Sequence, residues 1–370
     1  MSLNAQAADR LPVIAGAMKV YVLVEADGTV KTWGSPHDAE GPYLGDGTDG
    51  YVAPRDEPTL LAGVQGIVNA AVGPQHVLLL KRDGTVLAWG RNNACEVGSG
   101  DDKQRLTPVL VAGGLHGVVQ VDAAEAVSGA VQGDGTVWMW GGNQGGVLAN
   151  GQSGFGADCA KSPVKVEGLT GVKRIAVDSA NTIALKEDGT VWGWGMNKVG
   201  QLCDGTTEKR LHPVQMQGIT NAVDIANGGG NTVVLRADGT VWMCGQGGEA
   251  MNQNEKENTS HSTPFKVPGV SNAVAVRSVG GATMVRLRDG TLLGWGNGIF
   301  GILGDGNGDN HRVKPRAPKG LGPVLAHYYA SNSAFALKAD GTVMAWGIWG
   351  GDNVGWITKP MPLFKVDIAK

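Results

Sequence analysis

The sequence predicts an all-β protein, a seven-bladed β-propeller of four-stranded antiparallel blades. The first observation is its 60 glycines, which together with 11 tryptophans indicate short strands joined by tight turns. The second is a repeat: Asp-Gly-Thr followed by Val or Leu begins at Asp27, Asp83, Asp134, Asp188, Asp238, Asp289 and Asp340. The third is its period, because the copies are 56, 51, 54, 50, 51 and 51 residues apart and so account for the whole chain.

Each unit contains four short apolar runs. Two of them precede the Asp-Gly-Thr turn, as at 68–72 and 77–81, and a third follows it and ends near Trp-Gly. A long polar loop then leads to a fourth run that begins with proline, such as 108–111. The fifth unit departs from the pattern, because Cys244 stands where the others have tryptophan. Four strands make one small sheet, which must stack against its neighbours to bury both faces.

The repeated turn has a conformational explanation and needs no catalytic one. Glycine adopts a positive φ without steric cost, and the aspartate carboxylate accepts backbone N–H groups in the turn. The first and last copies are as regular as the others, so we expect ring closure rather than a capped linear stack. The expected propeller covers residues 11–366, with tails at 1–10 and 367–370. The spacing leaves open whether one blade is shared between the termini.

Composition and charge exclude several classes of partner. The formal charge is −3 and no run of basic residues stands out, so we expect no nucleic-acid partner. No stretch approaches the roughly 18 apolar residues that a membrane-spanning helix needs, so we expect no membrane insertion. The segment Ala5-Gln6-Ala7 resembles the end of a cleaved signal peptide, which favours an extracellular or periplasmic location over a cytoplasmic one.

The cysteines and histidines predict neither a metal nor a cofactor. The four cysteines (Cys95, Cys159, Cys203 and Cys244) lie far apart without a C-x-x-C pair, so we expect free, partly buried thiols, with one disulfide as the alternative in an exported protein. The seven histidines show no H-x-x-x-H spacing. Asp305 begins a loop with oxygen ligands at alternate positions, but Arg316 replaces the acidic twelfth residue of a calcium loop. No catalytic nucleophile can be named.

Two longer phrases surround the repeated turn. Gly73-Pro-Gln-His76 precedes an apolar run and the turn, and Trp194 to Thr206 reads W-G-M-N-K-V-G-Q-L-C-D-G-T. With these phrases the unit resembles the regulator of chromosome condensation repeat, whose pattern is W-G-x-N-x-x-G-Q-L-G-D-G-T, with Cys203 in place of one glycine. The resemblance implies a rigid disc whose loops bind partners. The D-G-T-V-x-x-W-G style is most similar to bacterial members.

The known members of this family differ in function. They include an exchange factor for a nuclear small GTPase, a plant ultraviolet photoreceptor and a secreted bacterial β-lactamase inhibitor. The exchange factor's basic tail and the photoreceptor's G-W-R-H-T phrase do not occur in this sequence. We therefore expect a non-enzymatic module, an inhibitor or adaptor, that binds another protein. The alternatives are a carbohydrate- or small-ligand-binding protein or an enzyme with its site at the central channel mouth, and then a GTPase exchange factor.

The positions where the copies differ indicate the binding face. The loop between the first and second strands ends seven residues before each turn aspartate, at Val20, His76, Val127, Asn181, Asn231, Ala282 and Ser333. Such variation is typical of a partner-facing surface, and the resemblance implies that these loops crowd one face around the channel. The expected partner contacts are Gln75, His76, Glu125, Asp178, Asn181, Asn231, Tyr328, Tyr329 and Asn332. The alternative for the two tyrosines is that they plug the channel mouth.

Two further tryptophans are candidate partner contacts. Trp349 and Trp356 lie in a long glycine-rich loop of the seventh unit, outside the third-strand position of the other tryptophans. They either anchor a partner or a sugar, or seal the junction between the last and first blades.

Overall fold

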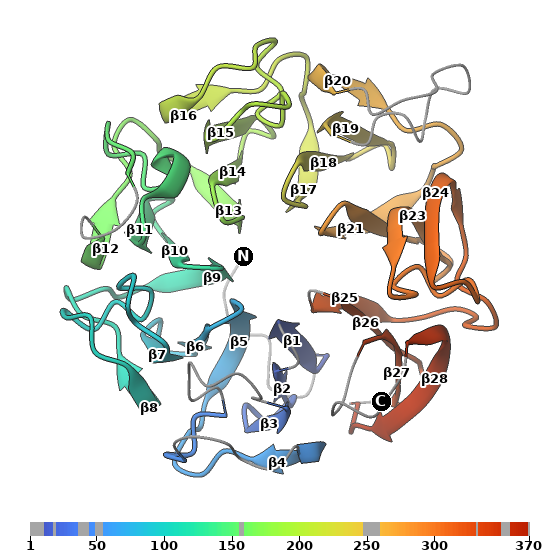
Figure 1. Ribbon diagram of the computed structural model, residues 1–370, viewed down its shortest axis with the longest axis horizontal. Coiled ribbons are helices and arrows are strands. Elements are labelled where there is room, and N and C mark those ends of the chain that lie inside the picture. The colour runs from blue at the N-terminus through green and yellow to red at the C-terminus, as the bar shows by residue number, and fades with distance from the viewer. Residues whose placement is uncertain are drawn as a thin grey trace.

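The structure is a computed structural model, which describes residues 11–17, 20–35, 44–48, 55–154, 159–246, 260–330, 332–348 and 356–368. Within these residues, seven four-stranded antiparallel sheets stand in a ring (Figure 1). The prediction of an all-β, seven-bladed propeller is confirmed. The expected tail at residues 1–10 lies outside the described residues.

The strands follow one another along the chain in groups of four. The first four blades contain β1 (Val13–Ala17), β2 (Val20–Val24), β3 (Val30–Gly34), β4 (Arg55–Leu60), β5 (Ile67–Val72), β6 (His76–Lys81), β7 (Val86–Gly90), β8 (Arg105–Leu110), β9 (Val118–Ala124), β10 (Val127–Gln132), β11 (Val137–Gly141), β12 (Ala160–Lys165), β13 (Val172–Val177), β14 (Asn181–Lys186), β15 (Val191–Gly195) and β16 (Arg210–Gln215). The last three contain β17 (Ala222–Asn227), β18 (Asn231–Arg236), β19 (Val241–Gly245), β20 (His261–Lys266), β21 (Ala273–Val279), β22 (Ala282–Leu287), β23 (Leu292–Ile299), β24 (Asp309–Arg316), β25 (Ala326–Ala330), β26 (Ser333–Leu337), β27 (Thr342–Gly347) and β28 (Ile357–Lys365). A 3-10 turn, η2 (Gln144–Gly146), follows β11.

The ring closes without sharing a blade between the termini. Within every blade the four strands are hydrogen-bonded in chain order, from β1-β2-β3-β4 to β25-β26-β27-β28. The first strand of each blade lies nearest the ring axis and packs beside the first strand of the next (Figure 1). The question that the spacing left open is thus answered, because β1 closes the ring by packing against β25.

Aromatic side chains seal this last-to-first junction. Tyr21 and Trp33 of the first blade stack with ring centroids 5.2 Å apart, and Phe335 of the seventh blade meets Tyr21 edge-on at 5.3 Å. The Tyr21 hydroxyl lies 2.9 Å from Ser333 Oγ across the junction. Trp356 instead meets Phe300 of the sixth blade at 5.4 Å, so it does not seal the ring.

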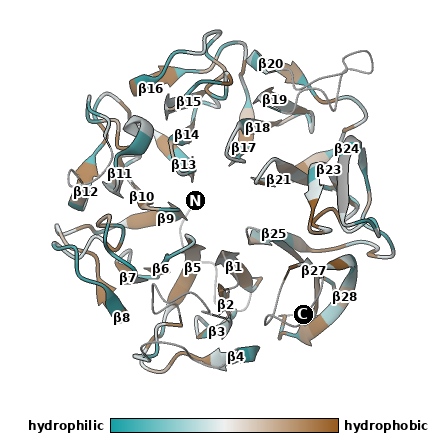
Figure 2. Ribbon diagram, in the orientation of Figure 1, coloured by the Kyte–Doolittle hydropathy of each residue, from teal (hydrophilic) through white to brown (hydrophobic). Residues whose placement is uncertain are grey.

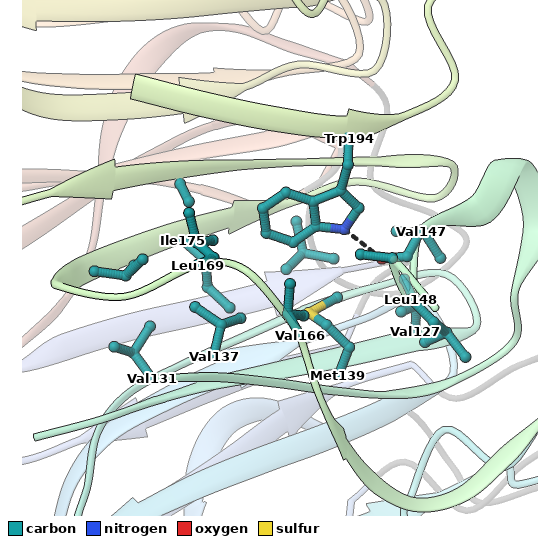
Figure 3. Packing of buried hydrophobic residues seen from close by; sticks show 14 residues of the cluster. Val127, Val131, Val137, Met139, Val147, Leu148, Val166, Leu169, Ile175 and Trp194 are labelled. Carbon is teal, nitrogen blue, oxygen red and sulfur yellow. Dashed lines mark hydrogen bonds between the residues drawn. The ribbon is translucent and has the colours of Figure 1, made fainter. Parts of the chain in front are cut away.

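The hydrophobic core lies between the blades. Each of seven buried clusters joins side chains of two neighbouring blades, one cluster for each junction. In the cluster of Figure 3, Trp194 of the fourth blade lies over Val137 and Met139 of the third. Figure 2 accordingly shows hydrophobic segments on strands throughout the ring. A blade is therefore stable only beside its neighbours.

The Asp-Gly-Thr turn connects blades as well as strands. Asp188 Oδ1 accepts hydrogen bonds from Thr190 N at 2.9 Å and Thr190 Oγ1 at 2.6 Å. Gly189 has a φ of 78°, and its carbonyl accepts a bond of 3.0 Å from Ala222 N of the next blade. A Cβ on Gly189 would lie 3.0 Å from the next blade's backbone, so glycine is needed for both its φ and its lack of a side chain. The corresponding bonds at the other turns are Ile67 N to Gly28 O, Val118 N to Gly84 O, Val172 N to Gly135 O, Ala273 N to Gly239 O, Val324 N to Gly290 O and, within the last blade, Val366 N to Gly341 O.

The tryptophan of the third strand packs on a glycine of the preceding blade. Trp140 is fully buried and its Nε1 donates to Glu96 O at 3.0 Å. A Cβ on Gly98 would lie 2.6 Å from the Trp140 indole, so the indole occupies the space that a side chain would need. The same close approach occurs between Gly45 and Trp89 and between Gly304 and Trp346.

At the fourth-to-fifth junction a disulfide replaces this glycine–tryptophan contact. Cys203 holds the position of the glycine, Cys244 that of the tryptophan, and the two form a disulfide with Cα atoms 5.7 Å apart. A second disulfide, Cys95–Cys159, joins the second blade to the third with a Cα separation of 5.8 Å. Cys95 and Cys203 have positive φ values of 63° and 54°, which favour glycine. The expectation of free thiols is wrong, since all four cysteines are paired.

Reduction of these disulfides should loosen two junctions. We expect a reductant to lower the free energy of unfolding by about 2–4 kcal/mol for each disulfide, because each one constrains the unfolded chain. Denaturant unfolding with and without reductant measures the effect. The double variant Cys203→Gly/Cys244→Trp restores the contact of the other junctions and should remain folded, with a smaller response to reductant. An unfolding curve that does not move when wild type is reduced would contradict the cross-links.

Candidate functional site: the loop face and the ring axis

The positions at which the loops between first and second strands end vary among the repeats and suggested a partner surface, but their side chains are buried. We call these positions the variable row. Its seven members (Val20, His76, Val127, Asn181, Asn231, Ala282 and Ser333) are each at most 3% exposed. They end the loops between first and second strands, where the side chain turns into the blade junction. Direct contact of His76, Asn181 or Asn231 with a partner stays a prediction, and burial places their side chains within the framework.

Members of this row pair with the next blade. His76 Nε2 lies 2.8 Å from Ser128 Oγ of the third blade, and Ser333 Oγ makes the corresponding contact with Tyr21. Repeat alignment places Ala282 opposite Ala334, and the two share one cluster. It places Val127 opposite Thr182, whose buried Oγ1 has no hydrogen bond. The row therefore varies together with the facing residue at most of the junctions.

A similar pairing holds the fifth blade to the sixth. Asn231 Oδ1 accepts a hydrogen bond of 3.1 Å from Ser278 Oγ, which also lies 3.1 Å from Thr283 Oγ1. At the fourth-to-fifth junction both facing residues, Asn181 and Thr232, are again polar. The Asn181 amide nevertheless has no hydrogen-bond partner.

The two tyrosines pack into the junctions on either side of the seventh blade. Tyr328 contacts the cluster shared with the first blade and donates a hydrogen bond of 2.6 Å to Pro12 O. Tyr329 contacts the cluster shared with the sixth blade. Burial raises the pKa of Tyr328 to about 12 and that of Tyr329 further. The side chains are half-buried parts of the framework, so the aromatic part of the expected face is built into the ring.

Four of the predicted contacts reach the surface from the loops between first and second strands. Glu125 and Asn332 are exposed, and Gln75 and Asp178 are half-buried. Burial raises the pKa of the Asp178 carboxyl, and the charge of Glu125 adds to this rise. The two carboxylates come from neighbouring blades, and the charge of Glu125 reaches Asp178 across this face. We call Gln75, Glu125, Asp178 and Asn332 the loop face.

The remaining candidates lie elsewhere. Trp356 is 49% exposed and stands before β28, the outermost strand of the seventh blade. Trp349 lies outside the described residues. A tryptophan pair therefore cannot be assigned to the loop face.

A row of charges on the innermost strands was missed in the sequence. Asp122, Arg174, Asp224 and Arg277 come from four successive blades, on β9, β13, β17 and β21. Asp224 accepts from Arg174 Nη1 at 2.5 Å and from Arg277 Nη1 at 3.3 Å. Burial raises the pKa of Asp122 to about 6, although hydrogen bonding and both arginines oppose the rise. The signal was available, since each residue stands 12 or 14 positions before a turn aspartate.

Side chains able to bind a metal are dispersed over the blades. Among the described residues, no three histidines, cysteines, aspartates or glutamates are grouped so that they could hold a metal ion. The described part of the chain also contains no helix of the length and hydrophobicity needed to cross a membrane.

Two junction histidines should make the fold sensitive to acid. Burial lowers the pKa of His76 to about 4 and that of His327 to about 3, so both are neutral in the folded state near pH 7. The unfolded chain binds these protons from about pH 6.5 downward, and stability present above that pH is lost as the pH falls toward 4. Each histidine should contribute a loss of roughly 3 kcal/mol.

Urea unfolding between pH 7 and 4 measures this loss. We expect His76→Gln to flatten the profile and the exposed control His212→Gln to leave it unchanged. Equal slopes for wild type and His76→Gln would contradict a buried neutral histidine.

Solved structures share this fold over most of their length. Human WBSCR16 superposes with a TM-score of 0.79 at 19% identity, covering 91% of this chain and 94% of that chain. Prp20p from Saccharomyces cerevisiae superposes with a TM-score of 0.75 at 18% identity, covering 95% and 86%. At these identities the likeness shows the fold alone.

Sequence comparison extends the relationship to the family. The Regulator of chromosome condensation (RCC1) repeat matches residues 83–131, 134–185 and 188–235. The Ultraviolet-B receptor UVR8 of Arabidopsis thaliana is 30% identical over 308 residues, which are 80% of this chain and 67% of the receptor. The human E3 ubiquitin-protein ligase HERC2 is 32% identical over 200 residues, but they are 4% of the ligase. With its period, its turns and its ring of blades, the chain belongs to the RCC1 repeat family.

Proposed function

We propose that this propeller is a non-enzymatic protein-binding module, an inhibitor or adaptor, and that it engages its partner through the loop face. The observation that carries the proposal is the presentation of Glu125 and Asp178 by short loops on a locked framework. The loop of Asp178 is closed by its own N–H, which donates to Asn181 O at 2.9 Å. Rigid presentation lowers the entropy that is lost on binding.

The charge of the loop face favours a basic partner. The carboxylates of Glu125 and Asp178 act on each other, so a lysine or arginine placed between them would relieve their repulsion. Gln75 and Asn332 add hydrogen-bonding groups. Prp20p, which is yeast RCC1, binds Gsp1p and histones and has also been solved with Kap60. Protein binding by this one protein of the same fold supports the same class of function here, as an analogy of fold.

The two disulfides favour a location of the protein in an oxidising compartment. Structural disulfides persist in extracellular and periplasmic proteins and are rare in the cytosol. Cys95–Cys159 and Cys203–Cys244 each join two blades, so they stabilise the framework that presents the loop face. We therefore propose an extracellular or periplasmic location.

Charge reversal on the loop face should weaken partner binding. We expect Glu125→Arg to weaken the affinity at least tenfold, because it places a positive charge against a basic partner. The control is Glu187→Arg, an equal reversal at an exposed residue beside the turn, at the opposite end of the blade. Partners retained by wild type from an extract of the source organism are identified by mass spectrometry and purified. Their affinity for each variant is then measured by calorimetry. Equal affinities of the two variants would contradict the loop face.

A further inference from the structure

One blade junction differs in chemistry from the other six. At those six, the residue three positions before a turn aspartate shares a buried cluster with the residue thirteen positions before the next one, and both are aliphatic. The pairs are Val24 and Ala70, Leu80 and Val121, Val131 and Ile175, Leu185 and Ile225, Leu235 and Val276, and Leu337 and Ile14. At the sixth-to-seventh junction these two positions hold Arg286 and His327.

Both polar side chains lack partners for buried nitrogen atoms. Arg286 is half-buried on β22, where it is registered with Ala275, and its buried Nε has no hydrogen bond. His327 is 4% exposed, and its buried Nε2 has none either. A buried polar group without a partner is costly. Arg236 Nε of the fifth blade also has none, so this junction is distinguished by the facing of an arginine and a histidine where the other six have aliphatic pairs.

The surroundings carry an excess of positive charge. Arg277 and Arg286 both act electrostatically on His327 and on the neighbouring Tyr328. Asp224 is already shared between Arg174 and Arg277. Among the described residues, no carboxylate forms an ion pair with Arg286. Arg286 therefore has no acidic partner, and the Arg277 side chain beside it is 34% exposed.

The order of residues in β22 shows that the charge is turned inward. The fifth blade has Leu235 followed by Arg236, with the leucine in the junction and the arginine over the Trp242 ring. The sixth blade has the reverse order, Arg286 followed by Leu287. Arg286 therefore occupies the inward position that Leu235 has in the fifth blade. Together with His327 it makes this position of the junction polar on both sides.

We propose that Arg277, Arg286 and His327 form a binding site for an oxyanion, a phosphate or carboxylate group, between the sixth and seventh blades near the ring axis. The planar guanidinium groups supply paired N–H donors that match the oxygens of either group. Nε2 of the neutral His327 ring has no partner and can accept a hydrogen bond from a protonated oxygen of the group, such as the P–OH of hydrogen phosphate. This site lies apart from the loop face and goes beyond protein binding, so either proposal can fail without the other.

The test uses the full chain and a variant of identical composition. Arg286→Leu/Leu287→Arg restores the order found in the fifth blade without changing net charge. Calorimetry with inorganic phosphate and with succinate, each against chloride at equal ionic strength, measures binding. We expect wild type to bind at least one of the two anions and the swapped variant to bind it at least tenfold more weakly. Binding of phosphate but not succinate would identify a phosphate site, and binding of succinate but not phosphate would identify a carboxylate site.

Two further variants keep the result decisive. Arg236→Leu removes the same charge from the neighbouring blade and should bind the anion as wild type does. If the swapped variant does not fold, His327→Val, which restores the aliphatic residue of the other junctions, should weaken binding by a similar factor. The proposal is overturned if wild type binds neither anion better than chloride, or if the folded variants of the junction bind as tightly as wild type.

Discussion

Burial between adjacent blades is the constraint on which the rest of the structure depends. A four-stranded sheet of this size cannot bury its own faces, so every large apolar side chain of the third strand must find its partner in the neighbouring blade. Trp140 does so over Gly98, and its indole N–H reaches a carbonyl of the preceding blade. The carbonyl of Gly84 ties the second blade to the third at the other end. The repeated turn motif thus forms a hairpin within its own blade and a hydrogen bond to the next blade.

This constraint explains where the copies differ. At several junctions the two facing residues differ together from those of the other junctions. Cys203 and Cys244 replace a glycine and a tryptophan together, and His76 pairs with Ser128 where other junctions pair apolar residues. Two polar groups are not paired across a junction in this way, namely the exposed carboxylate of Glu125 and the buried Nε of Arg286, and the two proposals above are built on them.

The period of the turn and the regularity of its first and last copies were enough to predict the four-stranded blades and the ring. They could not predict which residue of one blade faces which residue of the next. An alignment of the repeats identifies equivalent positions, whereas the contacts across a junction join positions that are not equivalent. Variation at His76 and Asn181 therefore suggested a surface, although both side chains are buried in junctions. The pairing of Cys203 with Cys244 was missed for the same reason. Glu125 and Asp178 do reach the surface from equivalent loops, to different extents, and their contact with a partner stays a prediction.

The central claim is that residues at the junctions are coupled in pairs across the blades. A double-mutant cycle on His76→Val and Ser128→Val measures this most directly, since the double variant recreates the apolar pair Val20 and Val77 of the first junction. We expect each single substitution to cost about 1–3 kcal/mol of unfolding free energy, and the double variant to cost at least ~1 kcal/mol less than their sum. Costs that add to within ~0.5 kcal/mol would contradict pairwise complementarity as the rule of this ring.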